Sequence, residues 1–367
     1  MKILHATLAL SLFATSLFAT SVFAADPKGR DYPDHSNLLV VRDADGSERP
    51  VKTPQDWAAR RAHILDGMQD VMGPLPDRCK LPPLDIKTSE TLDAPTYTRK
   101  TITFVTEPGD RLSAYLYIPK GIDKNHSRPA VVALHPTNRA LGKKVADGQS
   151  PLPNRAYARE LAQRGYVVIA PDYINMGDYK FDFRKGGYDS ATMKAILNHM
   201  RCVDLLQSLD EVDPGRIAAI GHSLGGHNSI FLGVFDPRVK VVVSSCGWTP
   251  FHDYMSGNIA GWSHDGYMPR LKTHYDLDPD RLPFDFYELV AALAPRPFMT
   301  NSPLHDDNFD YRGVQKAIAK AGDIYKLHGA AESIQARYPD AQHDFPTPVR
   351  QESYRFIDRA LKHKPTK

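Results

Sequence analysis

The sequence is poor in cysteine, in clustered charge and in long hydrophobic runs. Its 367 residues include three cysteines, Cys79, Cys202 and Cys246, which permit at most one intramolecular disulfide and exclude a disulfide framework. No Lys/Arg-rich run accompanies the formal net charge of +3, so the charge pattern does not indicate nucleic acid or an anionic membrane as a partner. The His-Asp pairs at 252–253 and 264–265 match no common ligand spacing, and we predict a protein without metal or cofactor.

The one long apolar segment lies at the N-terminus and predicts a signal peptide over residues 1–24. Lys2 provides a positive start, and an apolar stretch diluted by Ser, Thr and Ala runs to Phe23. It ends at Ala24, a small residue of the kind that signal peptidase reads. A membrane anchor is the alternative, but no Lys/Arg cluster follows closely and no later apolar run could span a bilayer. We expect cleavage after Ala24 and an exported protein, periplasmic or secreted.

Residues 25–95 are predicted to form an N-terminal extension with one helix. Thr53 can cap that helix, Pro54 suits its first turn, and Asp56 stands at the reciprocal position of a capping box. Apolar residues then recur near helical spacing as far as Met72.

From residue 96 to residue 367 the sequence alternates between strand and helix patterns. It opens with two alternating segments, 97–105 and 111–117, which indicate a hairpin. Strands that alternate with helices predict an α/β domain, with a mostly parallel sheet and helices on both faces. Further strands are expected at 130–134, 166–170, 216–220, 239–244, 297–301 and 334–338, and helices at 155–164, at 190–209, from residue 223 and at 349–361.

Residues 247–285 break this alternation with a segment rich in aromatic residues, Gly and Pro. A connection this long inside a compact domain is usually functional, and we predict a lid-like insert. Trp248 and Trp262 are candidates for a substrate wall, with a place in the core as the alternative.

The sharpest motif is Gly221-His222-Ser223-Leu224-Gly225, a G-x-S-x-G sequence. It follows a predicted strand and precedes a predicted helix, which is the context of a nucleophile elbow. Such a turn is tight and strained, so glycines are needed beside the serine. Ser223 is the predicted nucleophile, and His222 beside it is expected to serve packing.

A serine hydroxyl needs a base, and the base needs an acid that orients it. His343 follows the last predicted strand, and we predict that it is the base. Asp306 and Asp307 both follow the preceding strand, at 297–301; Asp306 is favoured as the acid and Asp307 is the alternative. Asp172 also follows a strand, but it precedes the serine in the chain, so it is expected to orient a loop.

The tetrahedral intermediate requires two backbone donors aimed at its oxyanion. The N–H of Leu224, directly after the nucleophile, is one candidate. The loop after the 130–134 strand supplies the other, and Thr137 is favoured because Pro136 has no N–H. The alternative is that this loop only forms part of the pocket wall.

These residues together resemble the α/β-hydrolase superfamily over most of Tyr97 to Lys362. The Gly221–Gly226 motif, the Leu304–Phe309 loop and the Gln342–Pro346 ending resemble its dienelactone hydrolase-like and acetyl xylan esterase-like branch. The resemblance implies an α/β-hydrolase fold and hydrolysis of carboxylic esters, of small molecules or saccharides, through an acyl-enzyme and without a cofactor. Dienelactone hydrolases use a cysteine nucleophile where this chain has a serine, so a general esterase is the expected activity.

Two alternatives to this esterase stay open. One is a serine peptidase of the prolyl oligopeptidase type, which shares the order of triad residues. The other is a catalytically silent binding protein that keeps the fold.

Overall fold

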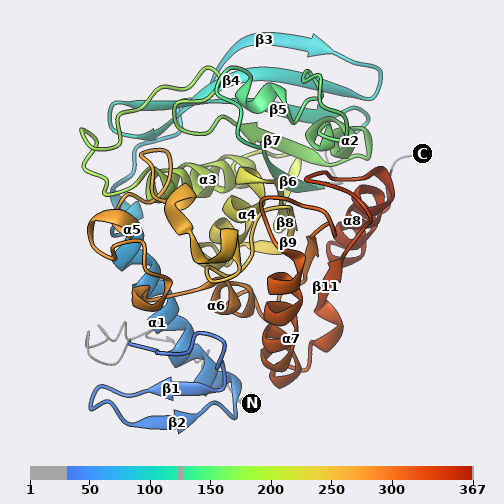
Figure 1. Ribbon diagram of the computed structural model, residues 1–367. Coiled ribbons are helices and arrows are strands. Elements are labelled where there is room, and N and C mark those ends of the chain that lie inside the picture. The colour runs from blue at the N-terminus through green and yellow to red at the C-terminus, as the bar shows by residue number, and fades with distance from the viewer. Residues whose placement is uncertain (1–30, 123–126, 366–367) are drawn as a thin grey trace, which may run out of the picture.

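A sheet of nine strands forms the core of the described part of the chain. Figure 1 shows the computed structural model, with β3 and β4 at one end of this sheet and β11 toward the other. The structure describes residues 31–122 and 127–365, so the predicted signal peptide lies outside the described residues. The strand order is β11-β10-β9-β8-β6-β7-β5-β4-β3. The strands from β11 to β7 run parallel, and β5, β4 and β3 continue the sheet in antiparallel pairs. The predicted mostly parallel α/β architecture is confirmed.

The bounds of the elements match most of the predicted ranges. The strands are β1 Val40–Arg42, β2 Glu48–Pro50, β3 Lys87–Asp93, β4 Tyr97–Glu107, β5 Asp110–Pro119, β6 Arg128–Leu134, β7 Val167–Pro171, β8 Val212–His222, β9 Val239–Ser245, β10 Phe298–Asn301 and β11 Ile334–Arg337. The helices are α1 Pro54–Met72, α2 Tyr157–Gln163, α3 Ala191–Gln207, α4 Leu224–Phe235, α5 Arg270–Thr273, α6 Phe286–Ala291, α7 Tyr311–Leu327 and α8 Thr347–Ala360.

Helices cover both faces of the sheet because successive strand residues point to opposite sides. In β6, Ala130 and Val132 belong to the apolar cluster that includes α1, α3, α4 and α7. Val131 and Ala133 belong to the second cluster, with α2 and α8. Strands buried on both faces read as continuous apolar runs, which explains why β6 is recognisable in the sequence.

The N-terminal extension contains the predicted helix, and its capping box is present. Thr53 accepts a hydrogen bond from the Asp56 N–H, and the Asp56 carboxylate accepts one from the Thr53 N–H. The predicted boundary at residue 96 is wrong in one respect, because β3 precedes it and pairs with β4 in the large sheet. β3 is exposed along its whole length, so it lacks the apolar alternation that would have revealed it.

The insert at 247–285, all of which the structure describes, contains only short helical segments, and α5 is its one α-helix. It is tied to the domain by a hydrogen bond from the Tyr173 hydroxyl to the Gly266 carbonyl (2.8 Å) and by an ion pair between Arg270 and Asp189 (2.8 Å). Within the described ranges, no helix is both long and apolar enough to cross a membrane.

Candidate active site

Ser223 lies at a strained turn between β8 and α4. Its φ of 54° and ψ of −120° place it in a region that non-glycine residues rarely adopt. The flanking glycines are required by close backbone contacts. A Cβ on Gly221 would lie 2.2 Å from the Gly225 carbonyl oxygen, and a Cβ on Gly225 would lie 1.9 Å from the Leu134 carbonyl oxygen. The turn therefore has the geometry predicted from the G-x-S-x-G motif.

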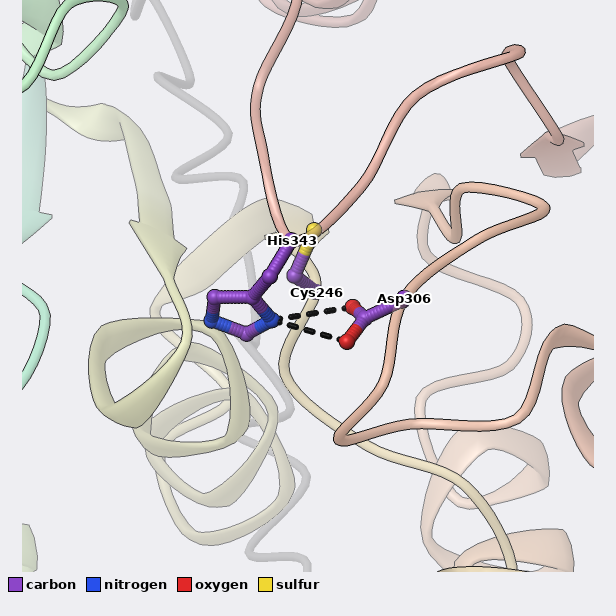
Figure 2. Close-up of side chains that lie close together, drawn as sticks. All are labelled: Cys246, Asp306 and His343. Carbon is purple, nitrogen blue, oxygen red and sulfur yellow. Dashed lines mark hydrogen bonds and ion pairs between the residues drawn. The ribbon is translucent and has the colours of Figure 1, made fainter.

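His343 and Asp306 lie in two loops that follow β11 and β10, and they are joined directly. The Nδ1 of His343 is 2.9 Å from Oδ1 and 3.0 Å from Oδ2 of Asp306 (Figure 2). The Asp306 side chain is fully buried, whereas His343 is 27% exposed. The Nε2 of His343 faces away from Asp306. Asp306 rather than Asp307 is thus the acid that the structure places against the imidazole.

The imidazole of His343 lies next to the turn that carries the serine. Its ring centroid is 4.9 Å from that of His222, which immediately precedes Ser223. His222 is buried and its ring also stacks on Phe345, which is the packing role expected of it. Among the residues that the structure describes, the Ser223 hydroxyl forms no hydrogen bond to His343. Hydrogen bonds between nucleophile and base are often long in free enzymes and shorten when substrate binds.

Buried polar contacts hold the loop that carries His343. Arg155 donates to the His343 carbonyl oxygen at 3.1 Å and forms an ion pair with Asp344. Asn301, the last residue of β10, donates to the Asp344 carbonyl oxygen at 2.9 Å. Burial would raise the pKa of Asp344, but hydrogen bonds from Arg155 and Asn154 lower it below its ordinary value. The sequence analysis did not predict a role for Arg155. The one available signal was Asp344, an acid directly after the predicted base that would need a basic partner.

The two candidate oxyanion donors lie at the start of α4 and in the loop after β6. Leu224 is the first residue of α4, where helix geometry leaves the N–H without an intrahelical acceptor. Thr137 is exposed, and its hydroxyl is 3.1 Å from the Tyr267 hydroxyl of the insert. In the described part of the chain, neither of these two N–H groups donates to another residue.

The loop after β6 is fixed to the loop after β7. Fully buried Lys143 forms ion pairs with Asp172 (2.7 Å) and Asp178 (2.6 Å). His135 accepts a hydrogen bond from the Tyr173 N–H at 3.0 Å, and burial lowers the pKa of this histidine. Asp172 therefore orients a loop, as predicted, and it holds the segment that carries Thr137.

Cys246, directly after β9, was not predicted at this site. Its sulfur lies within 4.8 Å of ligand atoms of Asp306 and His343 (Figure 2). Burial and then the Asp306 charge raise the pKa of the thiol well above its ordinary value. The thiol donates to the Asp344 carbonyl oxygen at 3.1 Å, and Nδ1 of His343 is engaged by Asp306, so the three side chains already bond to one another or to the backbone. Within residues 31–122 and 127–365, no other group of His, Cys, Asp and Glu side chains is close enough to share an ion.

The two tryptophans predicted as a possible substrate wall belong to the core. Trp248 is 0% exposed and donates to the Thr300 hydroxyl at 3.2 Å. Trp262 is 3% exposed and packs against Phe251 and Phe286. The substrate-wall prediction is wrong for both, because aromatic neighbours cover these side chains.

The serine lies at the strained turn after the central strand β8, and it is followed in the chain by an acid after β10 and a histidine after β11. This is the arrangement of the α/β-hydrolase fold. Comparison with known families agrees with this class. The model of the prolyl oligopeptidase family matches residues 155–363, and the chain belongs to that family. The matched range contains Ser223, Asp306 and His343.

Relatives and solved structures extend the likeness to most of the chain. YtaP of Bacillus subtilis (strain 168) is 25% identical over 307 residues, which cover 79% of this chain and 96% of YtaP. A glucuronoyl esterase from Solibacter usitatus superposes with a TM-score of 0.67 at 19% identity, covering 88% of this chain and 96% of that one. Acetyl xylan esterase 1 from Thermoanaerobacterium sp. JW/SL YS485 gives 0.56 at 16% identity, covering 84% and 94%. The predicted resemblance and fold are confirmed.

Proposed function

We propose that this protein is a serine hydrolase that cleaves carboxylic esters through an acyl-enzyme. The observation that carries the proposal is the buried Asp306 carboxylate held against Nδ1 of His343, beside the strained turn of Ser223. A carboxylate on Nδ1 fixes the tautomer in which Nε2 is unprotonated and able to accept a proton. A base of this kind is what converts a serine hydroxyl into a nucleophile.

The reaction would run in two halves. Ser223 Oγ attacks the ester carbonyl carbon while His343 Nε2 takes its proton, and the N–H groups of Leu224 and Thr137 stabilise the oxyanion. The imidazolium then protonates the departing alcohol, which leaves an acyl-serine. In the second half His343 removes a proton from water, the hydroxide attacks the acyl carbon, and the proton returns to Ser223 as the acid departs.

Acylated carbohydrates are the substrate class that we favour. Support comes from the likeness to a glucuronoyl esterase and to an acetyl xylan esterase over more than four-fifths of this chain. Export, which the N-terminal segment predicts, would bring the enzyme to polysaccharide outside the cytoplasm. N-terminal sequencing of protein from the exported fraction should read from Ala25; a chain retained in the cytoplasm and starting at Met1 would contradict export.

The activity is tested with a chromogenic ester and an active-site label. The protein should hydrolyse 4-nitrophenyl acetate and acetylated xylan oligomers, and a fluorophosphonate should modify Ser223. The Ser223→Ala variant should lose at least about 10³-fold in kcat and escape labelling while its thermal unfolding stays unchanged. Near-normal turnover by the folded variant would exclude this serine.

The family match favours a peptidase as the second candidate. The same protein is therefore assayed on a proline-containing peptide anilide. Cleavage of the anilide without cleavage of the esters would assign a peptidase. A protein that neither turns over substrate nor takes the label would be a silent member of the fold.

A further inference from the structure

A large cleft lies beside the loop that carries the candidate oxyanion donor. Its volume is about 760 Å³, and its walls come from the loop after β6, the loop after β7 and the insert. Thr137 lies on its wall, and so does Gly266. Because Thr137 is also the candidate oxyanion donor, the cleft and the proposed oxyanion hole share one loop. The Thr137 hydroxyl contacts Tyr267 of the insert as well.

Two positive charges in this cleft form no ion pair with a described residue, although Lys180 attracts Asp178 and helps to lower the pKa of that carboxyl. Arg139, Lys180 and Arg184 all contribute to its wall. Arg184 is neutralised by a two-pronged contact with Asp265 (2.5 and 2.9 Å). Arg139 and Lys180 are exposed, and among the described residues neither forms an ion pair or a side-chain hydrogen bond. The wall's remaining acid, Asp182, lies 3.6 Å from Lys185.

His264 adds a neutral donor to the same wall. Its Nδ1 accepts a hydrogen bond from the Gly266 N–H at 3.0 Å, so the proton of the neutral ring resides on Nε2. Burial and then the positive charge of Arg139 lower the pKa of His264, which keeps the ring neutral near pH 7. The cleft thus offers a guanidinium, an ammonium and an imidazole N–H from three separate loops.

The loops that carry the two unpaired cations are joined to each other. The Gly177 N–H donates to the Arg139 carbonyl oxygen at 3.0 Å, and Lys143 pairs with acids of the loop after β7. A fixed backbone lowers the entropy lost when a charged ligand binds. Planar guanidinium groups suit carboxylates because they can form two parallel hydrogen bonds.

We propose that this cleft binds a carboxylate carried by the substrate, separate from the ester that is cleaved. The inference rests on the proposed esterase function and narrows its substrates to acidic ones. The carboxylate could belong to the alcohol, as in an acetylated uronic acid, or to the acyl group, as in a dicarboxylic half-ester. Arg139 and Lys180 are then specificity residues, and they take no part in proton transfer.

The test compares matched charged and neutral esters. Acetylated methyl glucuronoside is paired with acetylated methyl glucoside, and 4-nitrophenyl hydrogen adipate with 4-nitrophenyl hexanoate. The wild type should prefer the charged member of at least one pair, and Arg139→Gln should reduce that ratio of kcat/KM about five- to tenfold, the effect of one well-formed charged contact. Raising the salt concentration should shrink the ratio as well. Lys320→Gln, an exposed lysine on α7, is the matched control and should leave the ratio unchanged.

Binding gives a readout that does not need turnover. Calorimetry on Ser223→Ala should show tighter binding of methyl glucuronoside or monomethyl adipate than of the neutral methyl glucoside or dimethyl adipate. Ester hydrolysis without charge preference in either pair, or an unaltered ratio in Arg139→Gln, would overturn the carboxylate site and leave the esterase proposal standing. Charge-selective binding without hydrolysis of any ester would support the site and contradict the esterase proposal.

Discussion

Replacing Asp306 by Asn tests the proposed triad most sharply, because the structure dictates how the amide must sit. Oδ1 of Asp306 accepts hydrogen bonds from the N–H groups of Asn308 (2.9 Å) and Phe309 (3.2 Å). An asparagine would keep its carbonyl oxygen at that position, since only an acceptor suits two donors. Its NH₂ group would then occupy the place of Oδ2, 3.0 Å from Nδ1 of His343, while the retained carbonyl oxygen would stay 2.9 Å from the same nitrogen.

The neutral amide impairs the base in either hydrogen-bonding arrangement. Where the NH₂ donates to Nδ1, the ring proton moves to Nε2, which can then no longer accept a proton from Ser223. Where the carbonyl oxygen accepts from the Nδ1–H, the tautomer is kept, but the imidazolium loses its stabilising carboxylate. We expect kcat/KM for 4-nitrophenyl acetate at pH 7 to fall about 10³- to 10⁴-fold, or about 4 to 5.5 kcal/mol in the activation free energy. The free energy of unfolding should change little, because the amide has the shape of the carboxylate.

The neighbouring acid provides the control for this variant. Asp307 is exposed, and His343 makes its contacts with Asp306, so Asp307→Asn should stay within about twofold of wild type, the range of surface substitutions. A folded Asp306→Asn enzyme within tenfold of wild type would refute the assigned role of this carboxylate. Equal losses in both variants would do so too.

Three further outcomes follow from the fold. Gly225→Ala should destabilise the protein by more than about 3 kcal/mol in urea unfolding because its Cβ would meet backbone at 1.9 Å, whereas Gly322→Ala, with open space on α7, should stabilise by about 0.5 to 1 kcal/mol. Burial lowers the pKa of His35, but Glu288 raises it more, to about 9. The charged imidazole should therefore contribute on the order of 3 kcal/mol to the free energy of unfolding, in full below about pH 6.5 and lost as the pH rises through 9. His35→Gln should remove this pH dependence from urea unfolding. Ellman's reagent should titrate one thiol, the exposed Cys79, in folded protein and three after unfolding.

The sequence predicts the inner strands well and the periphery poorly, for a physical reason. Strands such as β6 are buried on both faces and must be apolar throughout. β3 is exposed along its length and holds its place through backbone pairing with β4, which leaves no apolar pattern. Helix α7 was missed although Val314, Ala317, Ala321 and Ile324 are buried at helical spacing. The helical spacing of these apolar residues was present in the sequence, but the many polar residues between them obscured it.

The candidate site likewise contains some residues that the sequence predicts and others that it does not. The Ser223 turn can be recognised from adjacent residues, because Gly221 and Gly225 are each required by a close backbone contact. Asp306 and His343 were found from chain order, since the carboxyl ends of parallel strands meet at one edge of the sheet. Cys246 carries no local signature, because its place beside them depends on how three loops pack. Trp248 and Trp262 were misassigned because an aromatic residue in a long loop can face either core or cleft.

The groups proposed to react are thus separable from the groups that hold them. His343 is held through its carbonyl by Arg155 and through Nδ1 by Asp306, and neither contact involves Ser223. The base therefore keeps its position whether or not a hydroxyl faces it, so loss of activity in Ser223→Ala would report the missing nucleophile rather than a displaced base. Patterns in the sequence point to the triad proposed to react because the chemistry fixes the residue types and their order. A holding group outside the triad, such as Arg155, need only supply a donor or a charge from any nearby loop, and coordinates are required to find it.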